Sequence, residues 1–415
     1  MRPRSSVTTR RRPQILQQQM QLGRKHKPDY WLLIWCAALM AIGLIVVYAI
    51  SPALAITNNV SSNYYVDKQL IAIALSLVAF AITARVPLKT WRQAYKPLLI
   101  VAGLATLLAL ILPVNPLYPA HRWVRLGSFS FQSVELVKFA GMIWMAGFLA
   151  ERIQTDTIRS LNKTFKPLLI ALLATGLIIA GVQSDLGSTG VLVIMMGTMA
   201  FIAGLPMGRI VLIAGAVAIG LILAISATPY RRARLETFLH PDSNCQGSGY
   251  QACQSLISVG SGGIIGLGLG NSVQAYGYEP EAANDSIFAI YAEKFGFVGT
   301  MILLLIFGFF FTRLKSVAER LPDNFSRLLV IGVLAWFSTQ ALINIGGMVG
   351  LLPLKGITLP FISYGGTSVV FSAAAVGLVF QASQYTNYSA PRITTNDPDS
   401  QRRDFRDNTL RRDRD

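Results

Sequence analysis

The sequence predicts an all-α, polytopic membrane protein with about ten transmembrane helices. Of its 415 residues, 53% are hydrophobic and only 14% are charged, whereas an ordinary soluble domain has roughly 25% charged residues. Apolar runs also recur at about 20 residues, the length that crosses a hydrocarbon core about 30 Å thick. These observations exclude a soluble enzyme.

Each predicted span is an apolar run bounded by polar or charged residues. The first, 30–50, is followed by Ala53-Leu54-Ala55, which mimics a signal-peptidase site. Because the run is longer than the apolar region of a signal peptide, we expect it to be retained as a helix. The other nine predicted spans are 70–86, 97–112, 134–150, 167–182, 191–205, 210–226, 298–312, 328–348 and 367–381.

Charge predicts the orientation of these spans. Lys and Arg cluster after the second, fourth, sixth and eighth spans, so these ends and both termini are placed in the cytoplasm. The basic residues 1–29 and the mixed-charge residues 386–415 lack apolar periodicity and are predicted to be disordered tails flanking one membrane domain, 30–385. The net charge of +17 follows from the same rule, so no nucleic-acid partner is expected.

Several cations lie on the outer side, where the assigned orientation predicts few Lys and Arg residues. They are Lys68, Arg122, Arg125, Arg231, Arg232, Arg234 and Lys355. Such cations predict an anionic ligand, and lipid phosphate or a lipid-linked pyrophosphate is the candidate beside a membrane. Anchoring to lipid headgroups is the alternative. A binding site for an anionic ligand is favoured over headgroup anchoring by the succession of Arg122, Trp123 and Arg125, followed by Glu135 and Lys138.

Two pairs of polar residues interrupt the apolar sequence, one within a span and one between two spans. Glu135 and Lys138 are three residues apart near the start of the fourth span, hence on one helix face. Ionisable residues at that depth are costly and usually functional, although a structural ion pair between helices is the alternative. Gln183 and Asp185 lie in the turn after the fifth span, where Asp185 either caps a helix or takes part in chemistry.

The longest extracytoplasmic segment, 227–297, lies between the seventh and eighth spans and is expected to carry function. In it, Asp285 precedes an apolar helical stretch, as a helix cap or a general base would. The glycine-rich stretch 260–271 lacks the Lys-Ser/Thr of a phosphate loop and predicts close backbone packing. Cys245 and Cys253 can form a disulfide in an oxidising compartment. With three His and no CxxC, no zinc site is expected.

Eight ordered motifs together resemble one family, SEDS (shape, elongation, division and sporulation), the polytopic peptidoglycan glycosyltransferases. They are residues 122–123, 132–138, 183–187, 247–251, 268–274, 279–282, 285–289 and 353–366. The Gly-Asn-Ser-x-Gln run at 270–274 is most similar to the cell-division and sporulation branch, and the division branch is the specific expectation. Ser133 and Ser184 stand where the family usually has Pro, and Asn284 where it usually has Thr.

The resemblance implies polymerisation of lipid II at the outer face of the cytoplasmic membrane, at the division septum, with release of undecaprenyl pyrophosphate. It implies a class B penicillin-binding protein transpeptidase and other divisome proteins as partners. A lipid II flippase and a non-catalytic divisome scaffold are the alternatives; a flippase needs ionisable groups near the membrane midplane, whereas the polar residues here cluster at the outer surface.

The resemblance also assigns roles to residues. Asp285 matches the essential aspartate and is the expected general base. Arg122, Lys138, Arg231 and Lys355 are candidate pyrophosphate partners, with Glu135 orienting Lys138, Trp123 beside the prenyl chain, and Gln183 and Asp185 as supporting residues. A divalent cation, Mg²⁺ or Mn²⁺, assisting the pyrophosphate is compatible with this chemistry, but the sequence shows no dedicated metal cage.

Overall fold

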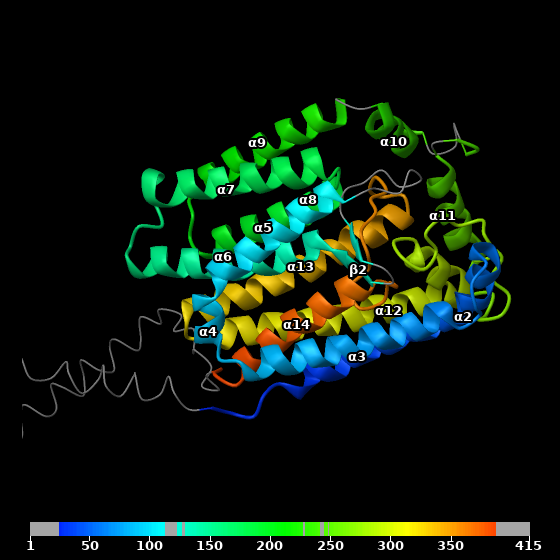
Figure 1. Ribbon diagram of the computed structural model, residues 1–415, viewed down its shortest axis with the longest axis horizontal. Helices are drawn as coiled ribbons and strands as arrows, with labels where there is room; N and C mark the ends of the chain where they lie inside the picture. The colour runs from blue at the N-terminus through cyan, green and yellow to red at the C-terminus, as the bar shows by residue number, and fades with distance from the viewer. Residues whose placement is uncertain are drawn as a thin grey trace, which may run out of the picture.

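All ten predicted spans are helices in the structure, a computed structural model that describes residues 25–112, 123–126, 129–226, 229–240, 245–247 and 249–386 (Figure 1). Seven helices are long and apolar enough to cross a membrane, and three shorter apolar helices complete the ten. The helices are α2 (Tyr30–Asn58), α3 (Tyr64–Arg85), α5 (Tyr95–Ile111), α6 (Ser133–Gln154), α7 (Lys166–Gly176) continued by η2 (Leu177–Val182), α8 (Leu186–Ile202), α9 (Met207–Ser226), α12 (Ile287–Arg320), α13 (Asn324–Met348) and α14 (Gly366–Ser383).

The outer segments contain more regular structure than the sequence predicted. Strands β1 (Trp123–Leu126) and β2 (Phe129–Gln132) form an antiparallel pair, with Trp123 opposite Gln132, and they are the only strands among the described residues. The predicted loop 227–297 holds α10 (Pro229–Leu239), α11 (Tyr250–Ser261) and the start of α12. Gly296 breaks α12 with non-helical φ 63° and ψ −163°, so the span predicted from residue 298 begins just beyond this kink. The remaining short helices are α4 (Leu88–Gln93) and η1 (Leu161–Phe165).

Close helix packing builds the centre of the bundle. A Cβ on Gly377 of α14 would lie 2.0 Å from Oγ1 of Thr83, so glycine allows α14 to pack directly on α3. A Cβ on Gly332 of α13 would lie 2.7 Å from Cγ of Met142 on α6. Trp336 and Met142 are fully buried between these helices. Helices α6 and α13 therefore form a rigid interior against which the outer segments are placed.

Both ends of the described chain lie at the same end of the bundle, as the charge pattern predicted. The backbone N–H of His26 donates to the carbonyl of Gln384 (2.8 Å), and that of Asp29 donates to Oγ of Ser383 (2.9 Å). Arg313, after the eighth span, pairs with the Asp29 carboxylate. Helices α10 and α11 lie at the opposite, outer end (Figure 1). Residues 1–24 and 387–415 of the predicted tails lie outside the described residues, whereas residues 25–29 are held against the end of α14.

Candidate active site at the outer end of the bundle

Asp285 lies in the turn that leads into α12, at the outer end of the bundle. Its side chain is buried, with 9% of its surface exposed. The N-cap residue of α12 is Ser286 rather than Asp285. Nδ2 of Asn344, on α13, donates a hydrogen bond to the carbonyl of Asp285 (2.7 Å). The backbone at Asp285 is thus tied to the rigid interior.

The segment 357–366, part of the last motif seen in the sequence, holds the same turn from the other side. Oγ of Ser363 donates to the carbonyl of Asn284 (2.6 Å). The backbone N–H of Tyr364 donates to the carbonyl of Ala283 (2.8 Å). Three successive carbonyls, at residues 283–285, are therefore bonded to α13 or to this segment, which restricts how far the turn can move.

Lys355 and an arginine of α10 lie close to this turn. Nδ2 of Asn344 also donates to the carbonyl of Ile357 (2.7 Å), which joins the turn of Asp285 to the segment that carries Lys355. Nη1 of Arg234 approaches the carbonyl of Leu354 (3.4 Å), so α10 contacts the same segment. The segments that carry one carboxylate and two cations therefore lie close together at the outer end, although they are distant in the sequence.

A cavity of about 240 Å³ lies between α10, α11 and the end of α13. Its lining combines the Arg234 guanidinium, the Gln251 amide and the Thr237 hydroxyl with apolar side chains such as Leu256. Nε2 of Gln251 donates to Oγ of Ser286 (3.2 Å), so the cavity wall touches the residue after Asp285. A guanidinium, hydrogen-bonding groups and apolar surface suit an anionic amphiphile.

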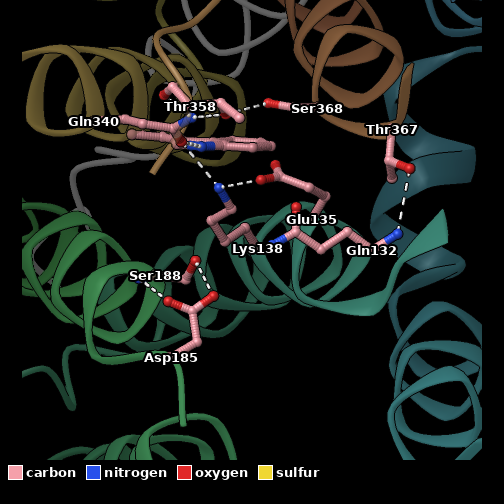
Figure 2. A network of polar contacts seen from close by, with 10 residues as sticks. Gln132, Glu135, Lys138, Asp185, Ser188, Gln340, Thr358, Thr367 and Ser368 are labelled. Carbon is pink, nitrogen blue, oxygen red and sulfur yellow. Dashed lines mark hydrogen bonds and ion pairs between the residues drawn. The ribbon is translucent and has the colours of Figure 1, made fainter. Parts of the chain in front are cut away.

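Glu135 and Lys138 form a buried ion pair inside the bundle (Figure 2). Nζ of Lys138 lies 2.8 Å from Oε1 of Glu135 and 2.9 Å from Oε1 of Gln340, and it sits over the Trp336 ring, 4.9 Å from its centroid. Lys138 is 0% exposed. The geometry favours the structural alternative, in which the pair locks α6 to α13, over direct contact with a pyrophosphate at the surface.

The network around this pair continues toward the outer segment. Nε2 of Gln340 donates to the carbonyl (2.9 Å) and to Oγ1 (3.1 Å) of Thr358, and Oγ1 of Thr358 lies 2.9 Å from Oγ of Ser368 on α14 (Figure 2). Three helices and the segment 357–366 are thereby joined through buried polar side chains. Such a network, when satisfied, specifies one packing of the helices.

Asp185 and Gln183 occupy structural positions. Oδ1 of Asp185 accepts a hydrogen bond from the Ser188 backbone N–H (2.9 Å), and Oδ2 accepts one from the Ser188 hydroxyl (2.9 Å). Asp185 therefore caps α8, which was one of the two interpretations of the sequence. Nε2 of Gln183 donates to Oγ of Ser133 (2.9 Å). Ser133 stands where the resembled family usually has Pro, and its hydroxyl supplies an acceptor that proline lacks.

The glycine-rich stretch packs backbone against backbone on α12, as predicted. Gly266 has φ +82°, and a Cβ there would lie 2.2 Å from the carbonyl oxygen of Lys294. A Cβ on Gly262 would lie 2.1 Å from the carbonyl oxygen of Ala292.

The structure also joins Cys245 and Cys253 in a disulfide, which attaches the preceding turn to α11.

Arg122 lies outside the described residues, and the side chain of Arg231, on α10, is likewise not described. Trp123 is half-buried in β1. Within the described part of the chain, no group of three or more His, Cys, Asp or Glu is arranged to hold a metal ion.

Sequence reasoning missed four buried side chains that organise the site. Gln340 and Asn344 are uncharged amides within the predicted span 328–348, so a search for ionisable residues in the spans does not find them. Glu293 accepts hydrogen bonds from the backbone N–H groups of Val273 (2.8 Å) and Gln274 (3.2 Å). Glu279 accepts one from Oγ of Ser255 (2.8 Å). Glu279 lies in the motif 279–282 and Glu293 four residues after the motif 285–289, and this proximity to motifs was the available signal.

Glu279 is a buried carboxylate of this outer segment whose pKa is raised. Burial raises its pKa from the ordinary value of 4.5 to about 7, against the opposing effect of hydrogen bonds from Ser286 and Ser255. The nearby carboxylates of Asp285 and Glu293 raise it further. Near neutral pH, Glu279 is therefore poised between its protonated and ionised forms.

We expect Glu279→Gln to abolish the part of the pH dependence of folding stability that comes from titration of Glu279. Because the pKa is raised in the folded state, the associated stability is present below pH 4.5 and is lost as the pH rises through about 7. The variant should match the wild type near pH 4.5 and exceed it at pH 8 by at most about 3 kcal/mol. Unfolding midpoints at both pH values test this, with the exposed Glu281→Gln as control. A difference that does not change with pH would contradict the assignment.

The fold and site define a multi-pass membrane protein whose polar site opens at the outer end of a helical bundle. The family model of the FtsW/RodA/SpoVE cell cycle proteins matches residues 30–388. "Probable peptidoglycan glycosyltransferase FtsW" of Saccharophagus degradans is 37% identical, with coverage of 86% of this chain and 93% of the relative. "Stage V sporulation protein E" of Bacillus subtilis is 35% identical, with coverage of 88% and 99%.

Solved structures agree on the fold. A chain from a study described as "Structural coordination of polymerization and crosslinking by a peptidoglycan synthase complex" superposes with a TM-score of 0.69 at 24% identity, covering 86% of this chain and 97% of that one. The rod shape determining protein RodA of Thermus thermophilus superposes with a TM-score of 0.61 at 22% identity, covering 87% and 98%. By homology the chain belongs to the FtsW/RodA/SpoVE (SEDS) family and is a peptidoglycan glycosyltransferase.

Proposed function

We propose that this protein polymerises lipid II into glycan strands at the outer face of the cytoplasmic membrane during septal wall synthesis. The observation that carries the proposal is the buried side chain of Asp285, held in a restricted turn at the outer end that hydrogen bonds join to the segment of Lys355, which Arg234 also contacts. The chemistry needs a carboxylate and cations at one site, because one group must accept a proton while others stabilise a departing pyrophosphate.

In the proposed reaction, the acceptor 4-hydroxyl attacks the anomeric carbon of the lipid-linked donor sugar. Asp285 accepts the hydroxyl proton as the new glycosidic bond forms, since the hydroxyl is otherwise a poor nucleophile. The bond between the anomeric carbon and the phosphate oxygen breaks, and undecaprenyl pyrophosphate leaves with its negative charge stabilised by Lys355 and Arg234. Arg122 and Arg231 remain candidates for the same task, and Trp123 for contact with the prenyl chain.

The outer cavity supports a lipid-linked substrate. Its Arg234 and Gln251 can bind phosphate or sugar oxygens, and its apolar side chains can contact the first part of a prenyl chain. Because its wall is bonded to Ser286, a group bound there would lie next to the proposed base.

We further propose that the enzyme works at the division septum with a class B penicillin-binding protein transpeptidase, which crosslinks the new strand, and with other divisome proteins. Similarity to relatives named FtsW supports the division role. Similarity to a chain from a peptidoglycan synthase complex supports a transpeptidase partner.

The test is polymerisation of purified lipid II in liposomes, with the cognate transpeptidase present. We expect glycan polymer from the wild type and none from Asp285→Ala. Equal polymer from both would remove Asp285 from the mechanism. Translocation of lipid II without polymer would instead support the flippase alternative.

A further inference from the structure

Asn344 occupies a central position between the proposed base and the proposed cation. It lies near the outer end of α13 and is 1% exposed. Nδ2 donates one hydrogen bond to the carbonyl of Asp285 and one to the carbonyl of Ile357, each at 2.7 Å. Both hydrogens of the amide are therefore used between two segments that are distant in the sequence.

The chemistry of these contacts requires an amide. Both partners are carbonyl oxygens, so rotating the amide by 180° would place Oδ1 against two acceptors, and the orientation is determined. An aspartate would bring a carboxylate to the same two carbonyls, leucine has no donor, and serine has only one. Oδ1 of Asn344 is buried and accepts no hydrogen bond from the described residues. The polar contacts of this side chain are thus confined to the two carbonyls.

The second carbonyl leads directly to Lys355. The backbone N–H of Ile357 donates to the carbonyl of Lys355 (2.8 Å), so the bond from Asn344 fixes the tight turn that carries this lysine. A Cβ on Gly187 would lie 2.6 Å from Cγ1 of Ile357 and 3.2 Å from Cβ of Lys355, so the turn is also held against the start of α8. Asn344 therefore connects the backbone of the carboxylate to the backbone of the cation through one planar group.

We infer that Asn344 is a positioning residue, which holds Asp285 and the Lys355 turn at a fixed separation so that both face the same reacting atoms. The inference rests on the proposed function, because it assigns Asn344 to that reaction. Displacing a catalytic group by about 1 Å can cost about 10²-fold in rate. The loss should therefore appear in the chemical step rather than in substrate binding.

The test compares lipid II polymerisation by the wild type, Asn344→Leu, which is also branched at Cγ but has no donor, and Asn344→Ser, which keeps one donor. We expect kcat per folded molecule to fall about 10- to 100-fold in Asn344→Leu and by less in Asn344→Ser, with KM changed by less than about twofold. Thr339→Val is the matched control, since Thr339 is buried on the same helix at 8% exposure; it should keep the wild-type kcat.

The outcomes separate the two proposals. If both Asn344 variants keep the wild-type kcat, or if their losses equal the fall in folded protein measured by thermal unfolding, the inference is overturned and the proposed function stands. A rise in KM at unchanged kcat would also overturn it, because it would place Asn344 in substrate binding. A wild type that makes no polymer would overturn the proposed function and this inference together.

Discussion

Replacing Asp285 by Asn is expected to lower the rate of lipid II polymerisation by about 10²- to 10⁴-fold, the range for loss of a positioned general base. The amide has nearly the same shape as the carboxylate but cannot accept the hydroxyl proton. The hydrogen bond from Asn344 reaches the backbone carbonyl of residue 285, not its side chain, so the turn keeps this attachment in the variant. The loss should therefore occur without unfolding.

The measurement is the initial rate of polymer formation by purified protein at equal amounts of folded enzyme. Asp323→Asn is the matched control, because Asp323 caps α13 at the opposite end of the bundle and Asn is an equally good cap. The control should keep the wild-type rate. A comparable loss in both variants, or no loss in Asp285→Asn, would exclude Asp285 as the base.

Replacing Lys138 by Met is expected to have the largest effect on stability, a loss of about 3–5 kcal/mol. The substitution leaves the Glu135 carboxylate buried at 2% exposure without its 2.8 Å partner. It also removes the donor to Oε1 of Gln340 (2.9 Å). The double variant Glu135→Leu, Lys138→Met should recover most of the loss, because no unpaired charge remains in the interior.

Thermal or denaturant unfolding in detergent checks this expectation. Lys315→Met is the matched control, since its partner Glu319 is 3.8 Å away and both side chains are largely exposed, at 68% and 62%. An exposed pair of this kind contributes at most about 1 kcal/mol. If Lys138→Met unfolds like Lys315→Met, the pair is not the structural lock proposed for α6 and α13.

Local patterns were enough to predict the helices and several details of the outer end. The ten spans were found because a helix that crosses a membrane must be apolar over most of its length, a property each segment has independently of the others. The close packing of 260–271 was likewise predicted locally, since a glycine-rich stretch permits close backbone approach. For Asp185 the sequence left a cap and a chemical role open, and the hydrogen bonds to Ser188 show the cap.

The burial of Lys138 could not be read from its own neighbourhood. Its contact with Glu135 spans three residues and was anticipated, but its second partner, Gln340, is 202 residues away. Only the packing of α6 on α13 decides whether this lysine faces the outer surface or the interior. The raised pKa of Glu279 has the same origin, because it depends on burial and on carboxylates brought close by folding.

Composition, charge asymmetry and contiguous motifs were enough to predict the class of protein, the number and orientation of its spans, and Asp285 as the candidate base. That Asn344 joins the turn of Asp285 to that of Lys355 became visible only in the folded structure. The physical reason is that hydrogen bonds and ion pairs act over about 3–4 Å, and such proximity between distant segments exists only once the helices have packed.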